Sequence, residues 1–199
     1  MAYEENGKEL ANYLHNKGIV ASIGHTDATC AQVMEASKNG VTSATHTYNA
    51  MKGLHHREAG TVGGVFLCDS IYSELICDLV HVSSDAIKVL YKIKGQDKIT
   101  LITDGIEAKH LPDGKYKLGG QDVYVKGKEA RLEDGTLAGS TLKMNDAIKN
   151  MQNVIGLSME KAIDLATINP ARVLGIDKQK GSIALGKDAD FAIIDKDYN

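Results

Sequence analysis

Four short apolar runs in this sequence each lead to a polar residue that can do chemistry. These residues, in chain order, are His25, His46, His81 and Asp104. In a barrel or sheet of parallel strands, the carboxyl ends of the strands open onto one face, so residues far apart in sequence meet there. Two imidazoles can hold a divalent cation, and a carboxylate on the last strand can carry the proton of the attacking water. The order of these residues is the one that a hydrolytic metal site needs.

Helical segments separate the apolar runs, and this alternation predicts a parallel α/β architecture. The first helix is expected from Glu5 to Lys17, with Gly18 as its cap. A second helix follows His25 and ends at Asn39-Gly40, and a third is capped by residues 83–85 and closed by Gly95.

Residues 106–139 break this rhythm. Glycine-containing turn pairs separate short alternating segments, which predicts a small antiparallel β insertion at about 106–139. Two helices are expected next, from Asn145 to Ile155 and from Ser158 to Thr167, with Asn169-Pro170 ending the second. Residues 176–199 alternate turn and strand signals, so we expect a C-terminal β-hairpin outside a main unit of residues 1–175.

The composition is that of an ordinary globular protein, with 43% hydrophobic and 25% charged residues. The 23 basic residues are balanced by 26 acidic ones and are scattered, which argues against a nucleic-acid partner. No apolar stretch approaches the ~20 residues needed to cross a bilayer, so we expect no membrane association and a cytoplasmic location. Three cysteines without zinc-ribbon spacing fit reduced thiols better than disulfides.

Six motifs carry a resemblance to a known family. They are Gly24-His-Thr-Asp-Ala28, Ala44-Thr-His-Thr-Tyr-Asn-Ala-Met51, His56-Arg-Glu58, Asp78-Leu-Val-His81, Leu101-Ile-Thr-Asp104 and Leu137-Ala-Gly-Ser140. In order and context the chain resembles the C-terminal half of the N-acetylglucosamine-6-phosphate deacetylases, within the amidohydrolase superfamily. The run from Ala44 to Met51 is the part that narrows the choice.

The resemblance implies the C-terminal half of a (β/α)8 TIM-type barrel, equivalent to strands five to eight. It implies a catalytic divalent metal, with zinc favoured over iron, manganese or cobalt, held by His25 and His46. Asp104 would be the general base that also returns the proton to the leaving amine. The residues that match sugar- or phosphate-binding positions are Asn49, Ala50, Arg57, His81, Leu137, Ala138 and Gly139. In the family, the residue matching Arg57 reaches the substrate of the partner subunit, which implies a homodimer.

The implied chemistry, hydrolysis of the N-acetyl group of N-acetylglucosamine 6-phosphate, asks for these residue types. An amide carbonyl is a poor electrophile, so the reaction needs a hydroxide, and a metal lowers the pKa of water from about 15.7 towards ~7. One carboxylate can act first as base and then as acid, which is the role implied for Asp104. A phosphate favours a bidentate guanidinium, and hence Arg57 over Lys52.

The resemblance begins just after the fourth barrel strand of the family. We therefore expect a carboxylate metal ligand, an upstream histidine and four strands to be absent from this chain. A half-barrel exposes strand edges, so we expect self-association or complementation by a separate N-terminal half.

Other interpretations stay open. The chain is either a deacetylase half that needs its complement or a catalytically inactive fragment that self-associates, and a third alternative is an amidohydrolase acting on a cyclic amide. Residue by residue, Asp104 can be a helix N-cap, His81 can satisfy a buried carbonyl, and Arg57 can be a solvated surface charge.

Overall fold

A four-stranded parallel sheet forms the centre of the protein in the computed structural model, which describes residues 1, 3, 6–195 and 197–198. The strands follow one another across the sheet in chain order. They are β1 (Ala21–Ile23), β2 (Val41–Ala44), β3 (Tyr72–Ile76) and β4 (Ile99–Ile102). The parallel α/β architecture predicted from the alternating pattern is confirmed.

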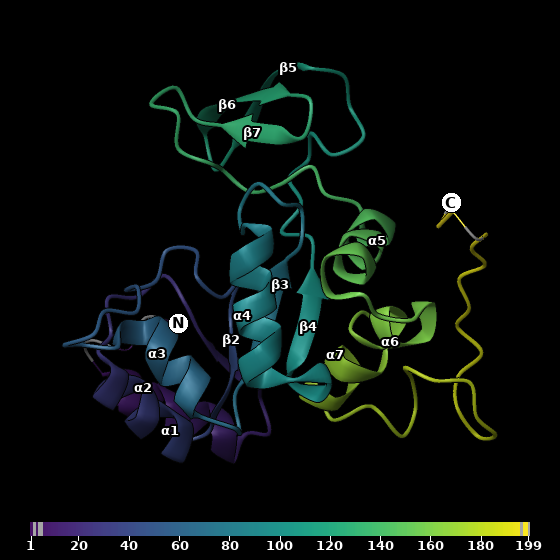
Figure 1. Cartoon of the computed structure of the whole chain (residues 1–199). Helices are drawn as coiled ribbons and strands as arrows, with labels where there is room; N and C mark the ends of the chain where they lie inside the picture. The colour runs from purple at the N-terminus through teal and green to yellow at the C-terminus, as the bar shows by residue number, and fades with distance from the viewer. Residues whose placement is uncertain (2, 4–5, 196, 199) are drawn as a thin grey trace.

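Helices connect the strands, as Figure 1 shows. They are α1 (Gly7–Asn16), α2 (Cys30–Lys38), α3 (Gly60–Leu67) and α4 (Ser84–Lys94), with a short 3-10 turn, η1 (Gln96–Lys98), before β4. Thr29 and Gln32 form a reciprocal capping box at the start of α2, and the Ser83 side chain caps α4. Three of these helices match the sequence prediction, whereas α3 does not.

Helix α3 was missed because its sequence contains adjacent glycines, which disfavour a helix in isolation. Packing explains why they are tolerated. A Cβ atom at Gly64 would lie 2.6 Å from the Cβ of Val33, so glycine allows α3 to approach α2 closely. Buried Lys94 of α4 then binds the end of α3, since its Nζ donates to the carbonyls of Val65 (3.0 Å) and Cys68 (2.8 Å). Burial lowers the pKa of Lys94 to about 8.

The two faces of the central sheet differ in polarity. Leu75 and Leu101 are buried in an apolar cluster with residues of α4 and α5. Side chains alternate along a strand, so the other face carries Glu74 and its register partner Thr100, together with Ser43. Ser43 and Thr100 are 1% and 3% exposed, so this polar face is also largely buried.

The inserted segment forms a separate three-stranded antiparallel sheet, as predicted. Its strands are β5 (Gly114–Leu118), β6 (Gln121–Lys126) and β7 (Glu129–Arg131). Val123, Val125 and Ala130 bury its inner side. In Figure 1 this small sheet lies beyond the carboxyl ends of β3 and β4.

Three further helices follow the insertion. They are α5 (Met144–Ile155), α6 (Met159–Asp164) and α7 (Ile168–Val173). Helix α7 corrects the prediction that Asn169-Pro170 ends helical structure there. Pro170 lies in the first turn, where its missing N–H costs nothing. Asn169 is fully buried and anchors this turn, since its Nδ2 donates to the carbonyls of Gln96 (2.7 Å) and Ile99 (2.8 Å).

The predicted C-terminal hairpin is wrong for the part of the chain that the structure describes. Residues 176–195 contain no strand and consist of turns and irregular chain (Figure 1, yellow), and the prediction for residues 196 and 199 lies outside the described residues. Its alternating apolar residues Ile183, Leu185, Phe191 and Ile193 are between 65% and 106% exposed. A two-stranded hairpin is marginal in water, and these side chains contact no sheet face that would stabilise one. The division into residues 1–175 and 176–199 stays a prediction.

No helix within residues 6–195 is long and apolar enough to cross a membrane.

Candidate metal and substrate site

His25 and His46 meet at the carboxyl edge of the sheet. Each follows its strand closely, after β1 and β2, and their Nε2 atoms lie 2.9 Å apart. Two nitrogen ligands of a tetrahedral zinc ion would be about 3.3 Å apart, given metal–nitrogen distances near 2.0–2.1 Å. The two Nε2 atoms lie at hydrogen-bonding distance from each other, somewhat closer than two zinc ligands would be. The two rings face each other edge-on, with an interplanar angle of 75°.

The main chain is strained at the residues that end these strands. The φ angle is 46° at His25, 33° at His46 and 47° at Asp104. Residues other than glycine rarely adopt these positive φ angles of the left-handed region. Such backbone strain is concentrated at functional sites. Each strand therefore turns sharply at the residue that bears the reactive side chain.

Asp104 follows β4 and is tied to the loop of residues 137–140. The Ser140 N–H donates to the Asp104 carbonyl (2.8 Å), and the Ile106 N–H donates to the Ser140 carbonyl (3.0 Å). Gly139 is required here, since a Cβ atom would lie 2.4 Å from the Ile106 side chain and its φ is +62°. Leu137 and Ala138 pair with β7, through a bridge to Arg131 and a 2.9 Å bond to the Ala130 carbonyl.

The loop after His46 folds back beside His25. The Asn49 side chain donates to the His46 carbonyl (3.2 Å), and the Ala50 carbonyl accepts from the Thr26 N–H (3.1 Å). An open hollow beside the histidine pair is lined by His25, Thr26, Asp27, Ala50, Met51 and Lys52. Asn49 and Ala50 therefore lie next to the candidate metal ligands.

His81 is held by a buried aspartate. Asp78 Oδ2 lies 2.6 Å from His81 Nδ1, and the side chains are 4% and 8% exposed. Asp78 Oδ1 also accepts from the N–H groups of Val80 (2.9 Å) and His81 (2.8 Å). Burial alone would raise the pKa of Asp78, but the bonds from His81 and the backbone outweigh it and hold the pKa below its ordinary value. Nδ1 is therefore engaged, and Nε2 is the ring nitrogen available to a ligand.

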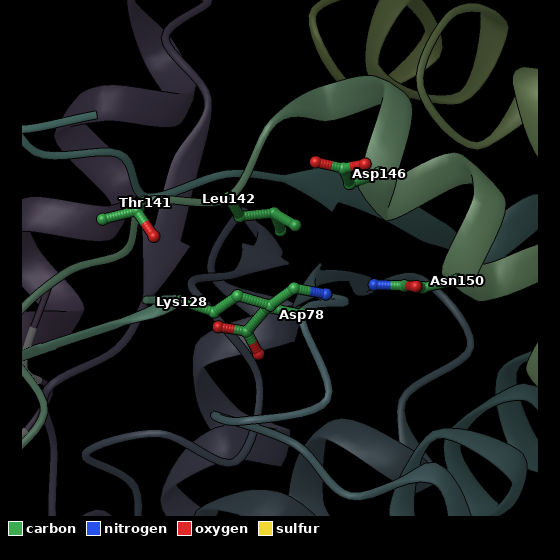
Figure 2. A pocket seen from close by; sticks show the side chains of 6 residues that line it. All are labelled: Asp78, Lys128, Thr141, Leu142, Asp146 and Asn150. Atoms are coloured by element: carbon green, nitrogen blue, oxygen red, sulfur yellow. The ribbon is translucent and has the colours of Figure 1, made fainter. Parts of the chain in front are cut away.

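A shallow pocket opens next to this pair (Figure 2). It is lined by Asp78, Lys128, Thr141, Leu142, Asp146 and Asn150. Lys128 belongs to the turn between β6 and β7, whereas Asp146 and Asn150 come from α5. The inserted sheet thus contributes a cation beside the Asp78 carboxylate.

Arg57 is exposed and lies on a tight turn. The N–H groups of His55 and Glu58 each donate to the other's carbonyl (3.1 Å), and Arg57 Nη1 contacts His56 Nε2 at 2.8 Å. The Glu58 carboxylate fixes this turn by accepting from the N–H groups of Cys30 (3.0 Å) and Gly60 (2.9 Å). These bonds lower the pKa of Glu58.

The residues present fit part of a metal centre. The donor chemistry is suitable, and His46 Nδ1 is buried without a hydrogen-bond partner among the described residues. No group of three or more histidine, cysteine, aspartate or glutamate side chains arranged for a metal occurs within that same part of the chain. A hydrolytic zinc site normally has three protein ligands. The histidine pair would fill two positions of such a site.

Two features of the site were missed by sequence reasoning. Glu74, in the middle of β3, is half-buried, and burial raises its pKa although the Ser43 hydroxyl donates to its carboxylate at 3.5 Å. The available signal was an ionisable residue just before the apolar residues Leu75 and Ile76. The role of Asp78 in orienting His81 had no signal beyond their spacing of three residues.

Imidazoles and a carboxylate at the carboxyl ends of the strands of a parallel α/β sheet are an arrangement that metal-dependent hydrolases use. Residues 8–199 match the Amidohydrolase family, and the chain belongs to this family.

Within it, the chain is similar to N-acetylglucosamine-6-phosphate deacetylases. It is 44% identical to that of Bacillus subtilis (strain 168), over 98% of this chain and 49% of the relative. It is 37% identical to an N-acetylgalactosamine-6-phosphate deacetylase of Escherichia coli O157:H7, over 96% of this chain and 51% of the relative. The deacetylase structure from Thermotoga maritima superposes with a TM-score of 0.94 at 43% identity, covering 100% of this chain and 55% of that one. The chain spans about half the length of the curated relatives that it matches.

Proposed function

We propose that this chain supplies the metal-holding and proton-transferring half of an N-acetylglucosamine-6-phosphate deacetylase. The observation that carries the proposal is the convergence of His25 Nε2 and His46 Nε2 to 2.9 Å at the edge where Asp104 ends the last strand. The similarity to deacetylases over nearly the whole chain supports the choice of substrate.

His25 and His46 would hold a divalent metal, with zinc as the first choice because neutral imidazoles suit it. When bound, the metal would activate water and polarise the amide carbonyl. Asp104 then accepts a proton from the attacking water and delivers it to the departing amine nitrogen. Asp104 is exposed, so its carboxylate is accessible from solvent.

The sugar phosphate would be recognised by residues around this edge. By the family resemblance these are Asn49, the Ala50 main chain, His81 and the loop of Leu137, Ala138 and Gly139, of which Ala50 lines the hollow beside the histidine pair. Arg57 is the phosphate anchor, because a guanidinium binds phosphate through two parallel hydrogen bonds. By the family resemblance, Arg57 acts on the substrate of a partner subunit in a dimer.

The sheet is proposed to be the second half of a (β/α)8 barrel. Its strands are parallel and in chain order, and β1 and β4 are each paired with a strand on one side only within the described sheet. Completing the barrel would pair the free edges of β1 and β4 and would provide the third metal ligand. Full activity is therefore expected only with the other half of a barrel.

The test is release of free amine from N-acetylglucosamine 6-phosphate with added Zn²⁺. The chain is assayed alone and with a separately expressed N-terminal half of the Bacillus subtilis deacetylase. Asp104→Asn serves as the catalytic variant, and Glu133→Gln, an exposed position on the inserted segment, as the charge-matched control. We expect activity in the mixture that Asp104→Asn removes and Glu133→Gln retains. Absence of activity in the mixture, together with absence of Zn²⁺ binding, would contradict the proposal.

One further candidate substrate has a specific observation in its favour. Because one relative is an N-acetylgalactosamine-6-phosphate deacetylase at 37% identity, the epimeric sugar phosphate is assayed in parallel. Light scattering of the isolated chain tests the alternative of an inactive fragment, for which self-association without amine release is expected.

A further inference from the structure

The two carboxylate oxygens of Asp78 bind different partners. Oδ1 accepts from the N–H groups of Val80 (2.9 Å) and His81 (2.8 Å), and so closes the tight turn that follows β3. Leu79, inside this turn, has a φ of 66°, a left-handed conformation that is costly for a bulky residue. One oxygen therefore stabilises a strained backbone, which leaves Oδ2 for a second role.

The partner of Oδ2 is the imidazole of His81. Oδ2 lies 2.6 Å from Nδ1 of the ring, and the two side chains are 4% and 8% exposed. Burial alone would raise the pKa of Asp78, but the bonds from His81 and the backbone outweigh it and hold the pKa below its ordinary value. Because an ionised carboxylate only accepts hydrogen bonds, Nδ1 of the ring carries the proton that joins the pair.

The order of the strands sets the location of this pair. Strand β3 lies between β2 and β4, so the turn of residues 78–81 follows the strand between those that lead to His46 and Asp104. Asn150 of α5 also donates to the Cys77 carbonyl at 2.8 Å, which fixes the chain just before Asp78. Both the backbone and the ring of His81 are thus held in place at the edge assigned to the reaction.

We propose that Asp78 is a positioning residue that fixes His81 as the tautomer protonated at Nδ1, so that Nε2 offers a lone pair to a sugar hydroxyl. A neutral imidazole carries one proton, and a proton held at Nδ1 leaves Nε2 as an acceptor only. Such an acceptor pairs with the O–H of a hydroxyl, whereas an ionised phosphate offers acceptor oxygens that it does not bind. His81 therefore recognises the sugar ring and not its phosphate. This inference rests on the proposed function, in which a sugar phosphate binds at this edge.

Asp78→Asn is the variant that tests the tautomer. Its amide oxygen still accepts from the N–H groups of the turn, but its NH2 group replaces the acceptor that faces His81 Nδ1. The ring then accepts at Nδ1 and carries its proton at Nε2. The same exchange in the triad of serine proteases leaves the geometry intact and produces the wrong tautomer of the histidine.

Asp134→Asn is the matched control. The Oδ1 atom of exposed Asp134 accepts from the N–H of Thr136 at 2.9 Å, as Asp78 Oδ1 does from the residue two positions on, but the turn of residues 134–136 contains no histidine. The control therefore reproduces the loss of charge at a turn aspartate without any change at an imidazole.

The first measurement is the tautomer of His81 in the full 199-residue chain, read from the nitrogen-15 NMR shifts of its ring at neutral pH. His81→Gln assigns the signals, which are absent from its spectrum, and far-UV circular dichroism confirms that each variant is folded. We expect the proton at Nδ1 in the wild type and in Asp134→Asn, and at Nε2 in Asp78→Asn. The inference is overturned if the wild-type ring is protonated at Nε2 or at both nitrogens, or if Asp78→Asn keeps its proton at Nδ1.

The second measurement is the kinetics of N-acetylglucosamine 6-phosphate hydrolysis in the mixture with the N-terminal half. We expect Asp78→Asn to raise KM about 3- to 10-fold, the loss of one neutral hydrogen bond, with kcat within about twofold of the wild type. A contact to a hydroxyl remote from the amide is equally strong in the ground state and the transition state, which explains why KM alone changes. An unchanged KM in a variant whose ring is protonated at Nε2 overturns the assignment of the lone pair to the sugar.

The failure of the proposed function would look different. A mixture that is inactive with the wild-type chain contradicts the deacetylase assignment, and with it the hydroxyl as the partner of Nε2. The tautomer in the isolated chain needs no substrate, so it still decides whether Asp78 fixes the His81 ring.

Discussion

The Asp78–His81 pair should be one of the main local contributions to stability, and Asp78→Ala tests this. The carboxylate is 4% exposed and accepts three hydrogen bonds, from His81 Nδ1 at 2.6 Å and from two backbone N–H groups at 2.8 and 2.9 Å. Removing one partner of a buried charged pair costs about 3–5 kcal/mol, since the remaining groups lose their bonds without regaining water. We expect a loss in that range.

Asp78→Asn should cost less, about 1–2 kcal/mol. The asparagine carbonyl can still accept from the backbone N–H groups of Val80 and His81. What it loses is the charged bond to the His81 ring. The Asp85→Ala variant is a control, because Asp85 is 89% exposed and pairs with Lys88 at the surface. Such a pair contributes about 0–1 kcal/mol.

The dependence on pH has a defined sign. The folded-state pKa of Asp78 lies below its unfolded value near 3.9, so its contribution is fully present above that value. The contribution is lost as the pH falls through the folded pKa. The difference in unfolding free energy between wild type and Asp78→Ala should therefore be largest at neutral pH and shrink below about pH 4.

The assay is urea denaturation followed by circular dichroism at pH 7 and pH 3. The reasoning is refuted if Asp78→Ala unfolds at pH 7 within about 0.5 kcal/mol of the wild type, the range of a neutral surface substitution. It is also refuted if the difference from the wild type is as large at pH 3 as at pH 7.

Three further predictions concern strain, burial and close packing. His25 is exposed with a φ of 46°, so His25→Gly should be more stable than His25→Ala by about 1 kcal/mol in urea denaturation; equal stability would show that the turn is unstrained. The pKa of Lys94 in the folded state is about 8, below its value in the unfolded state, so the unfolding free energy of the wild type should rise between about pH 8 and pH 10 as the buried ammonium loses its proton. The Lys94→Met variant should lack this rise. An identical pH profile for the two proteins would contradict the lowered pKa of Lys94. Gly64→Ala should lower the unfolding free energy by about 1–3 kcal/mol, because the new Cβ would lie 2.6 Å from the Cβ of Val33. Gly53→Ala, which has open space around it, should have no effect. Thermal unfolding of both variants is the test, and comparable melting temperatures would show that α3 can shift.

The central sheet could be predicted from the sequence because each of its strands is a short apolar run followed by a capped helix. Thr29 and Ser83 cap their helices with their own side chains, so the signal is local. The edge at which His25, His46 and Asp104 gather follows from parallel topology alone. What remains a prediction is the role of each side chain.

The parts that were not predicted depend on contacts distant in sequence. Helix α3 exists because Gly64 packs against Val33, and α7 because buried Asn169 reaches two carbonyls more than 65 residues away. Residues 183–193 show the opposite case. Their alternating pattern favours strands, but their apolar side chains stay exposed and pack on no sheet. A local sequence pattern therefore predicts a strand that does not form when no neighbouring sheet is present to pair with it. It also fails to predict a helix whose stability comes from tertiary contacts and not from its own residues.

The inserted sheet leaves and rejoins the main fold at nearly one point. Gly105 and Ser140 form a parallel bridge, and the bonds between Asp104, Ser140 and Ile106 close the base of the loop. The strands beyond this base, β5 to β7, are therefore attached to the main fold through one closed point next to Asp104. Changes in the length or sequence of those strands are expected to leave the Asp104 carboxylate in place, provided that Gly139 and its packing against Ile106 are kept.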